Sequence, residues 1–258
     1  MPMEIRIFRR SLFFLLSFLM FFGCATIPEI INLEQDESFT HDEIVGSMMG
    51  VGGVVSVAND IDESKSSKYA GILQKSFLTV RKEFVVLPVE EVIQWLGSDR
   101  YQTMLHHYRY KGLLDSDFVV KLKSSSIAFR YLLLVRIIEN ETTETRERCP
   151  RTEIPPQWDS KGNPVVKEIA VELTATRRMT VSLDIYDLSK GILAWSGMIN
   201  ESKSKQRTVY FEKKDEDLGR KFALIPVRAF LEVTLQPSAP PTDKLLHKIF
   251  KAFAQYMP

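Results

Sequence analysis

Gly23 and Cys24 are the residues whose type and position most clearly allow a defined chemistry, because a cysteine sulfur is a nucleophile open to covalent modification. They end an N-terminal leader in which three arginines among the first ten residues precede an uncharged apolar run over residues 11–22. A basic start with a short apolar core is typical of an export signal, and this run is shorter than the roughly 20 residues of a spanning helix. The leader therefore predicts export, with modification of Cys24 at its end.

The Gly23-Cys24 ending resembles the bacterial lipobox, with Phe21 at the position where leucine is usual. The resemblance implies that residues 1–23 are a cleaved signal peptide and that Cys24 is diacylated on sulfur, with palmitate-type chains. Two or more acyl chains anchor a protein stably in a membrane. Ala25 follows instead of aspartate, which resembles the sorting pattern for the periplasmic face of the outer membrane, or the outer leaflet of the inner membrane if sorting differs. An uncleaved signal anchor extended through residues 25–27 is the alternative.

Cys149 is the second of two cysteines and lies in a polar, proline-rich stretch. If Cys24 carries lipid, Cys149 has no partner in its own chain, and no disulfide framework is expected. The thiol is interpreted as unreactive and placed in a loop, with pairing to another chain as the alternative in an oxidising compartment.

The charge balance argues against a nucleic-acid partner. The 34 basic and 33 acidic side chains leave a net charge of +1. No global field would draw such a chain onto nucleic acid. The membrane contact expected for this protein is therefore the lipid on Cys24.

Two polar clusters have residue types that bind metals, but not the spacing. His106 and His107 are adjacent on a predicted helix, so their side chains diverge by about 100° and cannot share one ion. Asp60, Asp62 and Glu63 lack the rest of a calcium-loop pattern, and they are better explained as the cap of a helix. No metal or cofactor is expected.

The glycine-rich stretch over residues 50–53 precedes a predicted strand, whereas a dinucleotide-binding turn follows one, so it is interpreted as a flexible lead-in. Sequence patterns of nucleophilic and zinc hydrolases do not occur in the chain. With no catalytic residue indicated, the protein is predicted not to be an enzyme.

Periodicity predicts a mixed α/β fold with an antiparallel hairpin near its C-terminal end and helices packed against the sheet. Residues 24–49 are expected to be a lipidated N-terminus and tether, and residues 50–235 a single domain with a loop insertion over 142–168. Residues 236–258 are expected to be a proline-rich linker and an amphipathic helix. Within the domain, residues 128–138 are apolar enough for a central strand, covered on both faces. The alternation over residues 169–185 predicts a half-buried strand.

Several segments together resemble the periplasmic lipoprotein domains related to the curli-secretion lipoprotein, the penicillin-binding-protein activators and the N-terminal domain of TolB. These segments are Glu63–Val80, Phe84–Pro88, Arg130–Val135, Val181–Asp187 and the turn at Ser189-Lys190-Gly191 leading to Ala194–Gly197. They are fold motifs without catalytic residues. The resemblance implies a non-catalytic domain that binds other envelope proteins or assembles into rings.

The sequence as a whole thus predicts a lipid-anchored, protein-binding accessory or assembly factor of the periplasm. A self-assembling ring- or pore-forming secretion lipoprotein is the alternative, and a cell-wall hydrolase is a third possibility. Candidate partner contacts are the aromatic residues Trp158, Phe250 and Phe253. The oligomeric state is left open.

Overall fold

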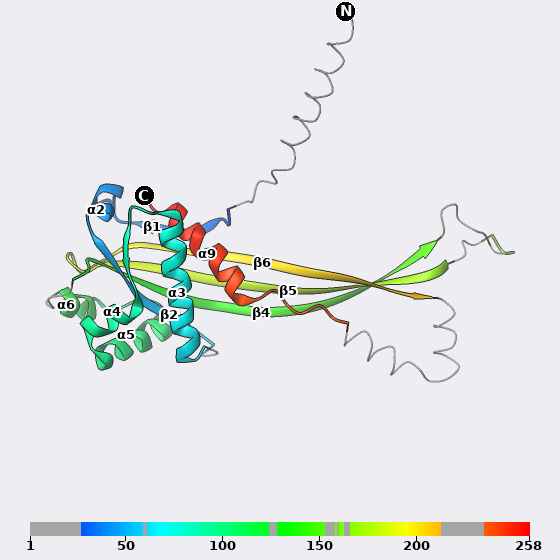
Figure 1. Ribbon diagram of the computed structural model, residues 1–258, viewed down its shortest axis with the longest axis horizontal. Coiled ribbons are helices and arrows are strands. Elements are labelled where there is room, and N and C mark those ends of the chain that lie inside the picture. The colour runs from blue at the N-terminus through cyan, green and yellow to red at the C-terminus, as the bar shows by residue number, and fades with distance from the viewer. Residues whose placement is uncertain are drawn as a thin grey trace, which may run out of the picture.

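The protein has a helix-covered body from which three long strands project as a ribbon (Figure 1). The structure is a computed structural model, and it describes residues 27–58, 61–123, 128–152, 158, 160–162, 166–212 and 235–258. Side chains are described over the same residues except 148–152, 166–169, 211 and 212. The leader and Cys24 lie outside the described residues.

One mixed sheet runs through the body, with strand order β1-β6-β5-β4-β2-β3. Its strands are β1 (Ile30–Gln35), β2 (Met48–Ser56), β3 (Val85–Leu87), β4 (Tyr131–Thr152), β5 (Val166–Asp187) and β6 (Ile192–Glu212). β2 pairs in parallel with β3 and β4, while β4, β5, β6 and β1 pair antiparallel. The predicted mixed α/β class, with its antiparallel hairpin and packed helices, is confirmed.

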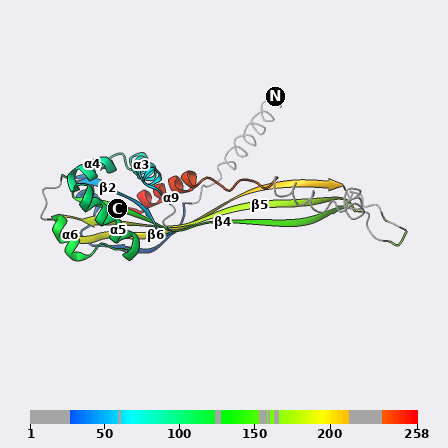
Figure 2. The ribbon, with the colours of Figure 1, turned by 90° about the horizontal axis from the view of Figure 1, so that it is seen from below.

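Helices cover both faces of the sheet in the body (Figure 2). The described helices are α2 (His41–Val45), α3 (Glu63–Val80), α4 (Val89–Leu96), α5 (Ser98–Lys111), α6 (Ser116–Lys123) and α9 (Thr242–Tyr256). α3 and α9 pack together on one face, where Phe253 meets Trp195 of β6 edge to face. α5 lies on the other face, where Tyr108 reaches Asp184 of β5.

β5 shows why the alternation in the sequence is informative. Met179, Val181, Leu183 and Ile185 are fully buried on one side of the strand. Because β4 and β6 flank β5 along its length, the strand lies in the middle of the three-stranded part of the sheet. The predicted strand is confirmed, although its other face is also covered in the body, where Asp184 is only 3% exposed.

The glycine-rich stretch predicted to be a flexible lead-in is instead part of the buried strand β2. Gly53 has a φ of +126°, and a Cβ placed there would lie 2.9 Å from the hydroxyl of Tyr101 and close to Leu105 of α5. Glycine therefore permits this backbone conformation and lets α5 approach the sheet closely. The prediction was wrong because these glycines lack side chains for close packing of α5 on the sheet, not for flexibility.

The predicted tether over residues 24–49 is wrong for about half of its length. Residues 30–35 form β1, residues 41–45 form α2, and β2 already begins at Met48. Phe39 and Ile44 in this segment are buried in the core at 1% and 0% exposure. These elements are too short to give a periodic signal, and their partners lie far away in the sequence.

The predicted loop insertion over residues 142–168 also differs from the structure. Residues up to Thr152 continue β4, and β5 begins at Val166. The backbone of Cys149 lies within β4, opposite Ala170. Of this insertion, residues 153–157, 159 and 163–165 lie outside the described part of the chain.

The predicted helix cap is present. The carboxylate of Asp62 accepts a hydrogen bond of 2.8 Å from the backbone nitrogen of Lys65, so Asp62 caps α3. Asp60, another residue of the predicted cap, lies outside the described residues. A capping aspartate satisfies one of the free amide groups at the start of a helix.

Candidate functional site

The ribbon is the part of the described sheet in which both outer strands lack a further strand partner. It comprises residues 138–152 of β4, 166–180 of β5 and 200–212 of β6. Strand pairing of β4 with β2 ends at Ile137, and pairing of β6 with β1 ends at Ile199. Beyond these points, no other strand in the described part of the chain pairs with the outer side of β4 or β6. The ribbon extends about 40 Å past the body at the usual rise per residue of a strand.

Its two outer strands carry opposite charge. We call Glu139, Glu141, Glu144 and Glu147 of β4 the acidic edge; Arg146 is the single basic residue within that stretch. We call Lys203, Lys205 and Arg207 of β6 the basic edge. All seven side chains are exposed. Glu201, the acidic neighbour on β6, is held by Lys248 of α9 at 3.0 Å, so the basic edge keeps its net positive charge.

The C-terminal segment before α9 secures one face of the ribbon at its root. The Nε atom of Arg177 donates to the carbonyl oxygen of Pro240 at 2.7 Å, and its Nη1 atom donates to Asn140 Oδ1 at 2.7 Å. Gln236 donates to the carbonyl oxygen of Thr174 at 3.1 Å. Residues 235–241 therefore hold the root of the ribbon against the body.

The opposite face of the ribbon is lined by short polar side chains. Thr176 and Ser204 lie 2.8 Å apart through their hydroxyl oxygens, and Thr180 donates to Glu139 at 2.9 Å. This pattern is typical of a solvated sheet face with cross-strand hydrogen bonds.

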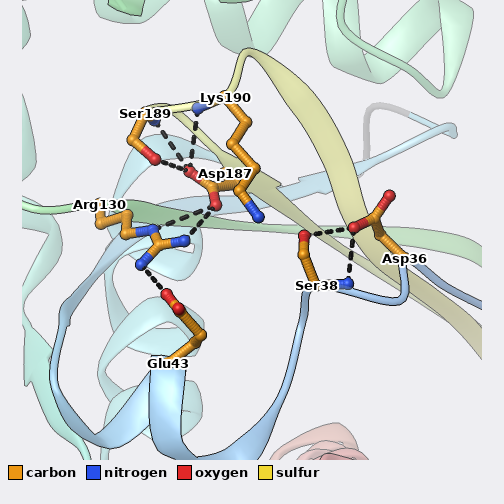
Figure 3. Close-up of polar contacts among 7 residues, drawn as sticks. All are labelled: Asp36, Ser38, Glu43, Arg130, Asp187, Ser189 and Lys190. Atoms are coloured by element: carbon orange, nitrogen blue, oxygen red, sulfur yellow. Dashed lines mark hydrogen bonds and ion pairs between the residues drawn. The ribbon is translucent and has the colours of Figure 1, made fainter.

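A second polar cluster closes the opposite end of the sheet (Figure 3). The Nε and Nη2 atoms of Arg130 lie 3.1 and 2.9 Å from Asp187 Oδ2, and Nη1 pairs with Glu43 of α2. The other oxygen of Asp187 accepts hydrogen bonds from the backbone nitrogens of Ser189 and Lys190 and from the Ser189 hydroxyl. We call this cluster the Arg130 latch, because it joins α2, β4 and the β5–β6 turn.

The electrostatics of the latch are those of a structural contact. Burial would raise the pKa of Asp187, but hydrogen bonds from Arg130 and Ser189 outweigh it and hold the pKa below its usual value. The same hydrogen bond raises the pKa of Arg130. Both groups are thus charged and mutually satisfied, which leaves neither available as an acid or base.

A buried carboxyl group, that of Asp184, lies between α5 and the sheet. Ser196 Oγ lies 2.5 Å from Asp184 Oδ1, and the Tyr108 hydroxyl lies 2.6 Å from Oδ2. Burial raises the pKa of Asp184, and these two hydrogen bonds only partly oppose it. A buried carboxyl with a raised pKa is the kind of group often found at functional sites. At 3% exposure, however, Asp184 is out of reach of a substrate.

The structure places the sequence-predicted contact residues differently. Trp158 is 63% exposed, as a partner contact requires. Phe250 and Phe253 are both 0% exposed in the core, so the prediction that they contact a partner is wrong. An apolar stripe on a helix shows that one face must be covered, but not by what.

The two histidines are neighbours on α5. His106 and His107 have ring centroids 6.3 Å apart, and His107 Nδ1 lies 3.4 Å from Asp115. Within the residues that the structure describes, no group of three or more histidine, cysteine or acidic side chains is arranged to hold a metal ion. In the same part of the chain, no helix has the length and hydropathy needed to span a membrane.

Comparison with known proteins gives little further information. No protein-family model matches the sequence, and no curated protein matches it either. The fold is similar to that of the PelC dodecamer from Paraburkholderia phytofirmans (TM-score 0.30, 12% identity, 67% of this chain and 80% of that chain). It is also similar to the lipoprotein GNA1162 from Neisseria meningitidis (TM-score 0.32, 11% identity, 71% of this chain and 96% of that chain). At such TM-scores the likeness carries no argument about function.

The sequence did not lead us to the ribbon or its charged edges. A signal was present in the pattern of glutamate and threonine over residues 139–147, and in the alternation of lysine, arginine and polar residues over 200–208. Only the stretch over 200–208 has the two-residue period of a strand, and without apolar residues both stretches also fit a solvated loop.

Proposed function

We propose that this protein is a lipid-anchored envelope protein whose ribbon binds another protein. It would act as an accessory or assembly factor, without chemistry of its own. The observation that carries the proposal is the ribbon, whose outer strands have no strand partner in the described part of the chain beyond Ile137 and Ile199.

Unpaired strand edges are the physical reason to expect a protein partner. The backbone amide and carbonyl groups of an edge strand are ready to pair with an extended segment of another chain. Side chains at alternate positions then select the partner. The acidic edge of β4 favours a segment rich in lysine or arginine, because like charges placed next to each other weaken pairing.

Crosslinking from the acidic edge tests this proposal. A photoreactive amino acid at Thr143, in the middle of the acidic edge, is expected to capture one discrete envelope protein in living cells. The same amino acid at Thr103, which is exposed on α5, is the matched control and is expected to capture none. Replacing Glu141 and Glu144 by lysine should abolish the product. Equal capture from both positions would contradict binding through the ribbon.

Acylation of Cys24 is tested separately. Wild type grown with radioactive palmitate is expected to carry the label and to sediment with membranes, whereas Cys24→Ser is expected to lose both properties, because the thiol is the acylated atom. The Cys149→Ser variant is the matched control and should keep the label. If wild type takes up no label, Cys24 is not an anchor and the lipoprotein assignment fails.

Self-assembly is a second candidate function, and the opposite charges of the two ribbon edges favour it. An acidic edge and a basic edge attract between copies in a head-to-tail arrangement, which gives rings when the rotation closes. The exposed Lys203, Lys205 and Arg207 of β6 argue against the pore-forming version, because a strand that crosses a membrane needs one fully apolar face. Light scattering of the soluble domain distinguishes the candidates, since self-assembly predicts a mass several times that of one chain.

A further inference from the structure

We propose that the β1–β6 side of the sheet lies on the surface of the phospholipid bilayer, with the basic edge against anionic headgroups. This inference rests on the proposed acylation of Cys24. It adds an orientation, in which the ribbon runs along the membrane and the acidic edge faces away from it.

The length of chain between the lipid and the fold brings β1 to the membrane. Ile27 follows Cys24 by three residues, and β1 begins at Ile30. Even a fully extended chain spans only about 10 Å to Ile27 and about 20 Å to Ile30. Since β1 is the outermost strand on its side of the sheet, that edge is the part of the fold nearest to the acyl chains.

β1 and the residues just before it expose apolar side chains where the membrane would be. Ile27, Ile31 and Leu33 are 52%, 41% and 46% exposed. An exposed apolar edge strand is an aggregation hazard that natural proteins usually cover or charge. Contact with the bilayer interface would cover it. Glu29 and Glu34 lie in the same segment, and their charges would stay at the level of the headgroups.

The basic edge continues the same side of the molecule. In the strand order β6 is next to β1, so the side of β6 that β1 leaves free beyond Ile199 faces the same way. Lys203, Lys205 and Arg207 lie at alternate positions of β6, so their exposed side chains share one face of this outer strand, and Glu201 is already paired with Lys248. Basic side chains next to a lipid anchor strengthen binding to anionic leaflets.

The negative charge on β4 determines which edge of the ribbon faces away from the membrane. The acidic edge is two strands away, about 10 Å across the ribbon at the usual strand spacing. A negative leaflet repels it, so the two edges favour the same orientation. The ribbon twists toward its tip, so the contact involves the part nearest the body (Figure 1).

Depth-dependent fluorescence quenching tests the position of β1. The acylated protein is reconstituted into vesicles of phosphatidylethanolamine and phosphatidylglycerol that contain brominated phosphatidylcholine, which quenches nearby tryptophan. The added emission of Leu33→Trp is expected to be quenched. Val85→Trp is the matched control, because Val85 is 48% exposed on β3 at the other edge of the sheet, and its added emission should be unchanged. No quenching of Leu33→Trp, or equal quenching of both, overturns the inference.

Vesicle sedimentation tests the basic edge. The mature chain with Cys24→Ser is expected to bind phosphatidylglycerol vesicles more tightly than phosphatidylcholine vesicles. Replacing Lys203, Lys205 and Arg207 by glutamate should weaken this binding at least about tenfold. The control replaces Glu141, Glu144 and Glu147 by glutamine and should not weaken it. If the basic-edge variant binds anionic vesicles as the parent does, or changes only the mass measured by light scattering, the edge faces another copy and the inference fails.

These outcomes are separable from the proposed function. Labelled, membrane-bound protein with an unquenched Leu33→Trp would refute the orientation and leave the lipoprotein assignment intact. Absence of label refutes the anchor itself, and the crosslink from Thr143 reports on the protein partner in either case.

Discussion

Replacing Phe253 by alanine is expected to lower the free energy of unfolding by about 3–5 kcal/mol, the usual cost of removing a buried aromatic side chain. Phe253 is 0% exposed, and its ring meets that of Trp195 at a centroid distance of 6.0 Å and an angle of 88°. Edge-to-face packing of this kind adds to the effect of burial alone. The truncation leaves a cavity between α9 and the sheet, which the surrounding strands cannot close.

Urea unfolding of the mature domain, followed by circular dichroism, measures this effect. Gln255→Ala is the matched control, because Gln255 is exposed on the same helix and its replacement should change stability by less than about 0.5 kcal/mol. A loss below about 1 kcal/mol for Phe253→Ala would mean that α9 is not part of the core. That outcome would restore the prediction that this helix binds a partner.

Replacing Arg130 by methionine is expected to cost about 3 kcal/mol at neutral pH, because the carboxylate of Asp187 stays buried without its counterion. Asp187 is 1% exposed, so water cannot solvate its carboxylate in place of Arg130. Arg130 also pairs with Glu43, and the guanidinium lies 5.0 Å from the centre of the Tyr131 ring. The β4 end, α2 and the β5–β6 turn should loosen together.

The effect of this substitution should depend on pH, with a definite sign. The pKa of Asp187 is lowered in the folded protein, so its contribution to stability is present above the unfolded pKa of about 3.9 and is lost as the pH falls through the folded value. Arg130→Met removes the hydrogen bond from Arg130 that lowers this pKa, so the pKa of Asp187 is expected to lie higher in the variant than in wild type. The stability difference between wild type and variant should therefore shrink as the pH falls from neutral toward about 3.

Urea titrations across this pH range measure the difference. Adding Asp187→Asn to Arg130→Met is expected to recover part of the lost stability at neutral pH, since the uncompensated charge is removed. Glu43→Gln is the control on the exposed side of the latch and should have a small effect, as partly exposed ion pairs contribute little. A pH-independent loss in Arg130→Met would show that packing, not charge, dominates at this site.

The sequence by itself determined the elements that have a clear hydrophobic periodicity. The alternation over residues 169–185 predicted β5 because a half-buried strand must place apolar residues at every second position. The apolar run over residues 128–138 predicted a central strand, and the stripe on α9 predicted an amphipathic helix. The leader and Cys24 were also recognised from a local sequence pattern. They stay predictions because they lie outside the described residues.

Tertiary structure alone decided what lies against what. The charged residues after Ile137 and Ile199 form strands because β5, which is 22 residues long, pairs with both β4 and β6. Pairing between strands that are distant in the sequence is not visible in the local sequence pattern. Phe253 lies in the core because α9 returns to the sheet, although its stripe would equally suit a partner's groove. Arg130 and Asp187 meet across 57 residues of chain. A periodic pattern specifies that a face is covered, and only the fold specifies the group that covers it.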